Sequence, residues 1–474
     1  MAAVSQLNRI SQRNEPQFYP AFFVNGEIMN QTNTIGKDFT TRELIRFVTP
    51  PIIGQFAMSL LITLDDGLFL SRFVGTTALA AFSIAWPIFM FFMAVAELFN
   101  GVAVLCATKM GEGKNEEAHQ DFTAIVIMSG AFACVMALLG QIFLDPLIIL
   151  MGGTELLIPY IKAFMEIGLW YIPLIMINHV FARFYVPAGS SRMSFIVTLI
   201  SAVSNFFFDW LFIVRLQAGM VGSAMANLLA NIVVFIIGIC FFSRKSSEIH
   251  FARPSGNMLS TLWQSMKFGF PPFLNNVAVA VNGFIANHVL LFVGGEESVS
   301  AYTIINDIQF MFMSGIWGFT GAVSPIVSYA FGEKNKAKIN KILRQIITIM
   351  AGLVVIIILF YLLGRNPMLN LFLKSDASEA VRHMTSQGLT IAPLGFLFFG
   401  YNVLAIDTFL ALHEKKISTT LSVLENLICA NLTILTLPFL FGVIGVWFAF
   451  PVGEILTFGG TLFFTLKNKK KYFC

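Results

Sequence analysis

The chain carries little charge. Only 12% of its 474 residues are Asp, Glu, Lys or Arg, whereas a soluble globular protein has about 25%. A surface in water needs charged side chains, so this shortage excludes soluble enzymes, disordered chains and nucleic-acid-binding proteins. No nucleic-acid partner is expected.

Motifs of several membrane-protein classes are also missing. The sequence has no Gly-x4-Gly-Lys-Ser/Thr phosphate loop, which argues against a primary pump, and no His-Glu-x-x-His metal motif. The longest connector between apolar stretches, Ser243 to Lys267, is too short for an extramembrane domain that could carry an active site. We therefore expect neither an enzyme nor an organic cofactor.

Cysteines and targeting signals are scarce as well. Four of the five cysteines lie in apolar stretches and the fifth is Cys474, so no disulfide framework is readable. The polar first forty residues lack the basic start, apolar core and cleavage site of a secretory signal. The first membrane span is then expected to direct insertion itself.

Apolar residues, in contrast, make up 57% of the chain. Apolar runs bounded by charged or turn residues predict twelve helices of about 20 to 27 residues, enough to cross a hydrocarbon layer of about 30 Å. They begin near residues 50, 82, 122, 160, 193, 220, 268, 301, 343, 384, 417 and 444. The predicted fold is an all-α polytopic membrane protein.

Lysine and arginine are divided unevenly between alternate connectors. The segments on the side of the N-terminus hold 21 of these residues and the opposite segments hold 6. Cytoplasmic segments of membrane proteins are enriched in Lys and Arg. Both termini are therefore predicted to be cytoplasmic.

The sequence also repeats itself once, at a nearly constant offset. Five short patterns recur in order, starting at Pro50, Phe99, Gly113, Gly168 and Gly219 in the first copy and at Pro271, Phe319, Gly332, Gly388 and Gly442 in the second. Six spans per copy is an even number, so both copies enter the membrane from the same face and are related by an axis along the membrane normal. Such repeats pack around a cavity that opens alternately to either side.

This repeat sets the expected domains. They are a polar cytoplasmic tail (1–43), a first six-helix lobe (44–243), a cytoplasmic linker (244–267), a second six-helix lobe (268–466) and a basic cytoplasmic tail (467–474). Two pseudo-symmetric lobes favour alternating access, and a channel is the weaker alternative.

Ionisable residues stand inside the predicted spans, where lipid makes them costly. A carboxylate at a helix centre costs about 2.5 to 3.5 kcal/mol to insert. These groups should therefore face the bundle interior, where a proton, a donor or a bound cation offsets that cost. The residues are Asp65, Asp66, Glu97, Glu166, Asp209, Asp307, Asp407, Glu425 and Glu454, with His179 and His288.

Several polar side chains of the first half share one predicted depth. At a rise of about 1.5 Å per residue, Asp66, Asp209 and Asn227 lie roughly 9, 8 and 11 Å below the outer ends of their spans. Asn205 is one helical turn before Asp209 and projects from the same face. Amide and carboxylate oxygens at one level suit a proton or Na⁺, although buried polar groups can also simply bridge helices, for about 0.6 kcal/mol.

Two other acids are candidates for substrate binding. Glu97 lies in the inner part of its span, where it could meet a cationic substrate or could be a capped structural carboxylate. Glu166 lies roughly 9 Å deep, where it joins the cation site or lines the outer vestibule. The acids of the second half scatter in depth, so the first half is the better candidate for coupling.

Four motifs belong together: Asp66-Gly-Leu-Phe69-Leu-Ser71, Gly111-Glu-Gly113-Lys-Asn, Asn205-x3-Asp209 and the Gly219, Gly222, Ala226 run. With them the chain, over about residues 44 to 466, resembles the multidrug and toxic compound extrusion (MATE) family, in its bacterial DinF/MepA-like branch. Two positions depart from the family pattern. Ser71 replaces a usual Gly, and Asn227 stands where relatives place a Thr ligand.

The resemblance implies a V-shaped pair of six-helix lobes that rock between inward-open and outward-open states. It implies that Asp66, Asn205 and Asp209 couple cation entry, with Na⁺ or H⁺ as the ion. We expect a monomeric antiporter of the bacterial plasma membrane that exports amphipathic, cationic compounds. A flippase for a lipid-linked precursor is the nearest alternative, and a membrane-embedded enzyme or a channel would be of another class.

Overall fold

The computed structural model describes residues 34–69, 73–151, 154–254, 257–373 and 378–472. Within these ranges some side chains lie outside the description, including those of residues 62–68. All regular structure in the described ranges is helical.

The helices of the first half are η1 (Thr34–Gly36), α2 (Thr41–Phe69), α3 (Thr76–Asn100), α4 (Val102–Gly111), α5 (Asn115–Ile142), α6 (Leu144–Leu150), α7 (Ile158–Phe184), α8 (Ser191–Asp209), the π-helix η3 (Trp210–Arg215) and α9 (Gly219–Phe242). Those of the second half are α10 (Met258–Gly332), α11 (Lys336–Phe372), α12 (Glu379–Ile391), α13 (Pro393–Ala411), α14 (Lys415–Val423), the π-helix η4 (Leu424–Cys429), α15 (Ala430–Phe441) and α16 (Val443–Tyr472).

Twelve stretches of the described helices are long and apolar enough to cross a membrane, which confirms the predicted number. They contain 19 to 38 residues, more than predicted at the upper end, because polar and basic turns prolong several helices beyond their apolar runs. The two spans of α10 meet at Gly295, whose φ of 66° and ψ of −167° lie in a region open essentially to glycine alone.

Large apolar side chains stay exposed on the outside of the helices. Leu150, Leu363 and Phe292 are 84%, 81% and 78% exposed. Water would disfavour such a surface, whereas lipid tails are as apolar as these side chains. The exposed faces therefore fit a bilayer.

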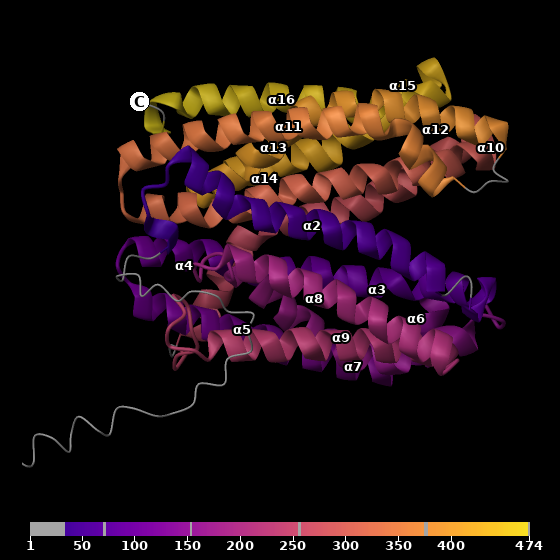
Figure 1. Cartoon of the computed structure of the whole chain (residues 1–474), viewed down its shortest axis with the longest axis horizontal. Coiled ribbons are helices and arrows are strands. Elements are labelled where there is room, and N and C mark those ends of the chain that lie inside the picture. Colours follow the sequence, from indigo (N-terminus) through magenta and orange to yellow (C-terminus); the bar gives the residue numbers. More distant parts are fainter. Residues whose placement is uncertain (1–33, 70–72, 152–153, 255–256, 374–377, 473–474) are drawn as a thin grey trace, which may run out of the picture. The chain divides into compact units, whose positions relative to one another are not determined.

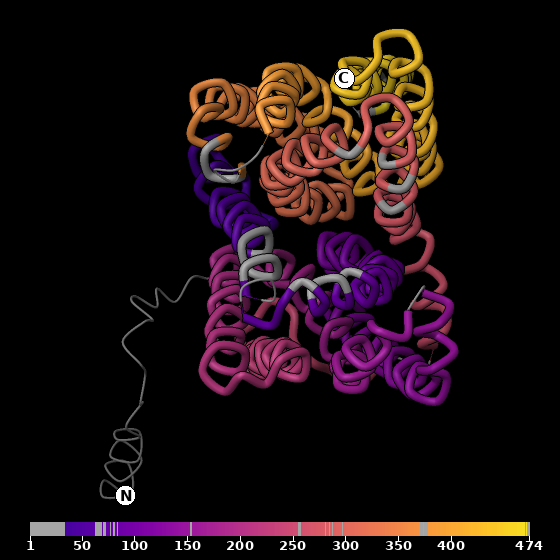
Figure 2. Tube along the Cα trace, turned by 90° about the vertical axis from the view of Figure 1, so that its right-hand side faces the viewer, coloured from indigo at the N-terminus to yellow at the C-terminus, as the bar shows by residue number. Residues whose placement is uncertain are grey.

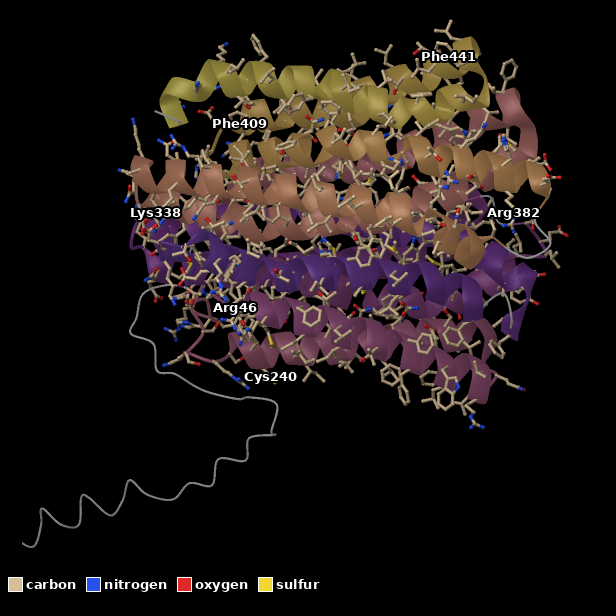
Figure 3. All side chains as sticks on the ribbon, turned by 45° about the horizontal axis from the view of Figure 1, so that its top comes forward. Arg46, Cys240, Lys338, Arg382, Phe409 and Phe441 are labelled. Atoms are coloured by element: carbon tan, nitrogen blue, oxygen red, sulfur yellow. The ribbon has the colours of Figure 1, made fainter. Side chains whose placement is uncertain are left out.

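Figure 1 shows α3 to α9 in one group of helices and α11 to α16 in another, with α2 along the boundary between them, and the turned view in Figure 2 shows this arrangement end-on. The long helix α10 packs against α2, against α3 and α4 of the first group and against α11 to α14 of the second. Lys338 lies at the end of the bundle where α16 ends, and Arg382 lies at the opposite end (Figure 3).

The backbone itself carries the repeat. Left-handed φ angles are rare in residues other than glycine. They nevertheless occur at four pairs of positions, and the two members of each pair are separated by the offset of the sequence repeat. The pairs are Gly75 and Gly295, Gly113 and Lys334, Gly189 and His413, and Gly219 and Gly442. The two halves thus turn at equivalent places even where glycine is replaced.

The halves meet at a pair of glycines on α4 and α10. A Cβ atom on Gly111 would stand 2.0 Å from the carbonyl oxygen of Tyr329, and one on Gly332 would stand 2.0 Å from that of Thr108. Gly111 and Gly332 are separated by the same offset as Thr108 and Tyr329, so the contact is reciprocal, as a pseudo-twofold axis requires. The sequence pattern paired Gly332 with Gly113, and the structure corrects its partner to Gly111.

Candidate functional site

The predicted cation site centres on Asp209. This residue ends α8 immediately before the π-helix η3, and it is 5% exposed. A π-helical turn interrupts the regular ladder of backbone hydrogen bonds and frequently marks a functional site. A buried carboxylate at such a turn is chemically suited to hold a proton or a small cation.

Asn205 and Asn227, two of the residues predicted for one cation site, are hydrogen-bonded to each other. Asn205 Nδ2 donates to Asn227 Oδ1 over 3.4 Å, between α8 and α9. Asn227 Nδ2 donates to the backbone oxygen of Ser223 at 3.1 Å, which turns its Oδ1 toward Asn205. Each amide oxygen has two lone pairs and can therefore accept one more partner.

The side chain of Asp66 lies outside the described residues, as does that of Asp65. The helix that carries them is nevertheless placed. The Phe69 ring at the end of α2 meets the Phe206 ring of α8 edge-on, with centroids 5.0 Å apart. Phe69 follows Asp66 by three residues and Phe206 precedes Asp209 by three, so the last turns of α2 and α8 lie side by side. Whether the two carboxylates share a ligand stays a prediction.

Two further asparagines, which the sequence analysis missed, extend this polar region along α9. Asn231 Nδ2 donates to the backbone oxygen of Asn227 at 2.9 Å. From α7, Asn178 Nδ2 donates to the backbone oxygen of Asn231 at 3.0 Å and to its Oδ1 at 3.2 Å. The available signal was the presence of amides inside apolar spans, which calls for an internal partner.

Glu97 of α3 is in the capped arrangement that the sequence left open. The residue is 4% exposed. Its Oε1 accepts from Arg183 Nη2 at 2.8 Å and faces His179 Nε2 at 3.0 Å, and its Oε2 accepts from Asn100 Nδ2 at 3.3 Å. His179 and Arg183 are one turn apart on α7, so both reach one carboxylate. We call these four residues the Glu97 cluster.

Arg183 connects this cluster with the second half of the chain. Its Nη1 lies 3.7 Å from the point where a Cβ on Gly321 of α10 would stand. It also interacts electrostatically with Asp407 of α13. The Arg183 side chain is 43% exposed, so it faces open space where the halves meet.

Glu166 lies elsewhere. Its side chain is exposed on α7, one turn before the exposed Trp170, and its backbone oxygen accepts from Gln141 of α5 at 2.6 Å. On α7 it is Asn178, and not Glu166, that contacts the polar side chains of α9. Among the described residues, the structure therefore does not bring Glu166 together with Asn205 and Asp209.

The comparison with known families now decides the relationship. The family model MatE matches residues 51–211 and 271–435. The chain belongs to the MatE family. The two matched segments correspond to the two copies of the repeat found in the sequence and in the backbone. Members of this family are multi-pass membrane transporters, so the expectation that the chain is not an enzyme is confirmed.

Curated MatE relatives extend over nearly the whole chain. The multidrug export protein MepA of Staphylococcus saprophyticus is 22% identical over 432 residues, covering 89% of this chain and 92% of MepA. A protein of Shewanella oneidensis named FAD transporter is 23% identical and covers 88% of this chain and 92% of its own length. The expected relationship to MepA-like proteins is confirmed.

Solved MatE structures share the fold. A multidrug resistance MATE transporter of the MOP superfamily, determined in an outward-facing conformation, superposes with a TM-score of 0.85 at 21% identity. The match covers 94% of this chain and 99% of the other. The all-α fold with twelve spans, as predicted, is therefore that of MATE transporters.

Proposed function

We propose that this chain is a secondary antiporter that exports amphipathic, cationic small molecules in exchange for H⁺ or Na⁺. The observation that carries the proposal is Asp209, a carboxylate buried at the joint between α8 and η3. The paired amides of Asn205 and Asn227 lie one turn away on α8 and on the neighbouring α9. The name of the relative MepA supports export of drugs.

The exchange follows because the coupling ion and the substrate favour different states of the first lobe. A buried carboxylate is stable when a proton or a cation neutralises it. The carboxylate of Asp209 and the amide oxygens of Asn205 and Asn227 are hard ligands of the kind that small cations prefer. Ion binding that favours one state of the first lobe must disfavour a substrate that requires the other state, by the same factor in both directions.

The charges around Arg183 support a cationic substrate. Glu97 and Asp407 are two acids beside one arginine, and His179 is the remaining titratable group. Glu97, Asp407 and Arg183 together have a formal sum of one negative charge, which would attract a cation into the space between the halves. A flippase for an anionic lipid-linked precursor would require the opposite sign there.

Several expectations belong to the same proposal. The two lobes would extend over residues 44–243 and 268–466, with the linker and both termini on the cytoplasmic side of a bacterial plasma membrane. The chain would act as a monomer without an organic cofactor, rocking between outward-open and inward-open states. Asp66 would complete the site with Asn205 and Asp209.

The test is efflux of a fluorescent organic cation from proteoliposomes under separately imposed pH and Na⁺ gradients. The wild-type protein should export under at least one gradient, and Asp209→Asn should lose that gradient-driven transport while it still inserts. Asp145→Asn is the matched control, because Asp145 is exposed and pairs with Lys162 away from the site. Absence of export under both gradients, or unchanged export by Asp209→Asn, would refute the proposal.

A further inference from the structure

Two buried glutamates meet in the second half of the chain. Glu425 lies in the π-helix η4 and is 6% exposed, and Glu454 lies in α16 and is 7% exposed. Their carboxyl groups interact electrostatically, and Asp407 of α13 adds a third acid nearby. The sequence places Glu425 in the inner half of its span and Glu454 near the middle of its own, and the structure shows that the two groups interact.

Glu454 is held in place by uncharged groups. Asn402 Nδ2 of α13 donates to Glu454 Oε2 at 2.8 Å and to the Glu454 backbone oxygen at 3.0 Å. Thr461 Oγ1 donates to Asn402 Oδ1 at 2.8 Å. Because the backbone oxygen can only accept, the orientation of the Asn402 amide is fixed.

The first half of the chain makes the same contact without an acid. There Asn178 donates to the backbone and side-chain oxygens of Asn231, at 3.0 and 3.2 Å. The offset that relates Gly219 to Gly442 in this part of the repeat also relates Asn231 to Glu454. A neutral amide therefore suffices for the helix contact, and packing alone does not explain a carboxyl group at position 454.

One carboxyl oxygen of Glu425 stands apart from the hydrogen bonds around it. This atom, Oε1, is buried and has no hydrogen-bond partner within the described part of the chain. The charged groups that act on Glu425 are both acidic, Glu454 and Asp407, and no ion pair to Glu425 or Glu454 occurs among the described residues. Two carboxylates without a cation cannot both stay ionised in a buried site.

The surroundings of the pair contain one other titratable group besides Asp407 among the residues that the structure describes, the thiol of Cys429 in η4. The side chains that form the hydrogen-bonded chain to Glu454, Asn402 of α13 and Thr461 of α16, are uncharged. Asn282 donates to the backbone oxygen of Asn426 at 2.9 Å and so ties η4 to α10.

We propose that Glu425 and Glu454 form a second ion site of this transporter, in which the two carboxyl groups hold one exchangeable proton. The proposal rests on the antiport function and adds to it a proton-binding step in the second half of the chain. A proton is favoured over a metal cation because it requires only two carboxyl oxygens. No group of three or more His, Cys, Asp or Glu residues suited to a metal occurs among the described residues.

Infrared spectroscopy of the purified protein tests the site independently of transport. The wild-type spectrum at neutral pH should contain the carbonyl band of a buried protonated carboxylic acid, shifted in D₂O. The double variant Glu425→Gln/Glu454→Asn should remove this band, and each single variant should shift it, because the remaining protonated carboxyl group has lost its carboxylate partner. The exposed Glu155→Gln is the matched control and should retain it.

The result that would overturn the proposal is a band that persists unchanged in the double variant. Loss of the wild-type band on addition of NaCl at constant pH would also overturn it, because the pair would then bind Na⁺. Glu454→Asn copies the residue of the first half, so folding is expected, and gel filtration checks it.

Proton release separates this inference from the proposed function. When a fluorescent organic cation binds to the protein in weakly buffered detergent solution, the wild type should release protons. The double variant Glu425→Gln/Glu454→Asn, which has neither carboxyl group, should lose part of that release. If gradient-driven export occurs but the double variant releases protons like the wild type, only the second site is refuted. If no gradient drives export at all, the proposed function fails, whereas the infrared result still decides whether the pair holds a proton.

Discussion

Replacement of Arg183 by Gln should destabilise the protein more than replacement of its partner Glu97 by Gln. Glu97 has 6% of its side chain exposed and Arg183 has 43%. An unpaired charge therefore costs more free energy at Glu97 than at Arg183, because water reaches Arg183. Removing one member of a buried ion pair costs about 3 to 5 kcal/mol, because the other charge stays buried. For Arg183→Gln we expect the lower end, about 3 kcal/mol, since His179 Nε2 still lies 3.0 Å from the Glu97 carboxylate.

The reverse substitution should be milder. After Glu97→Gln, the partly exposed Arg183 can turn toward open space or toward Asp407, so we expect about 1 kcal/mol, in the range of exposed pairs. The double variant Glu97→Gln/Arg183→Gln leaves no buried charge from the pair. Its stability should therefore match or exceed that of Arg183→Gln, with a coupling of about 1 to 3 kcal/mol.

The assay is the apparent melting temperature of each purified variant in the same detergent, followed by gel filtration after heating. The expected order of stability is wild type, Glu97→Gln, the double variant and then Arg183→Gln. Asp145→Asn, which breaks an exposed ion pair at 2.8 Å, serves as the control and should lie close to wild type. If the effects of the two single substitutions simply add in the double variant, the reasoning from burial is wrong.

Two further predictions concern the contact between the halves. Gly111→Val should lower the expression of folded protein and its melting temperature far more than Gly352→Val. A Cβ on Gly111 would stand 2.0 Å from the Tyr329 carbonyl oxygen, whereas one on Gly352 would meet open space. Equal effects of the two substitutions would contradict this packing. His413 lies between two spans, and its Nε2 is 2.9 Å from Thr108 Oγ1 of α4. Burial and the nearby positive charge of Lys415 lower the pKa of His413 from an ordinary 6.5 to about 4. The neutral ring is thus favoured in the folded state, so stability from this site should be complete above pH 6.5 and should decline as the pH falls toward 4. Melting temperatures at pH 7.5 and 5 should differ less in His413→Gln than in the wild type, and an equal difference in both proteins would contradict the assignment.

The sequence was sufficient to predict the spans and the repeat, because lipid imposes long apolar runs and because Pro and Gly recur at fixed offsets. It assigned Asn205 and Asn227 to one site, and the structure shows them hydrogen-bonded. Depth counting alone did not pair Glu425 with Glu454, because that pairing requires the contact between η4 and α16.

Other parts of the site depend on contacts that one chain's pattern does not encode. Gly111 rather than Gly113 meets Gly332, because the connectors turn at Gly113 and Lys334 and so set the register two residues away from the pattern match. The convergence of Asn100, His179 and Arg183 on Glu97 requires the packing of α3 on α7. Only the spacing of His179 and Arg183 by four residues could have indicated it beforehand.

The claim on which the proposed exchange depends is that an ion at Asp209 competes with the exported compound. The direct measurement is the affinity of the purified protein for a fluorescent organic cation, by anisotropy, over a range of pH and of Na⁺ concentration. For the wild type, the affinity for the dye should fall as the concentration of the coupling ion, H⁺ or Na⁺, rises. For Asp209→Asn, the affinity should not show this dependence on either ion. An Asp209→Asn protein that keeps the full ion dependence of the wild type would contradict the account.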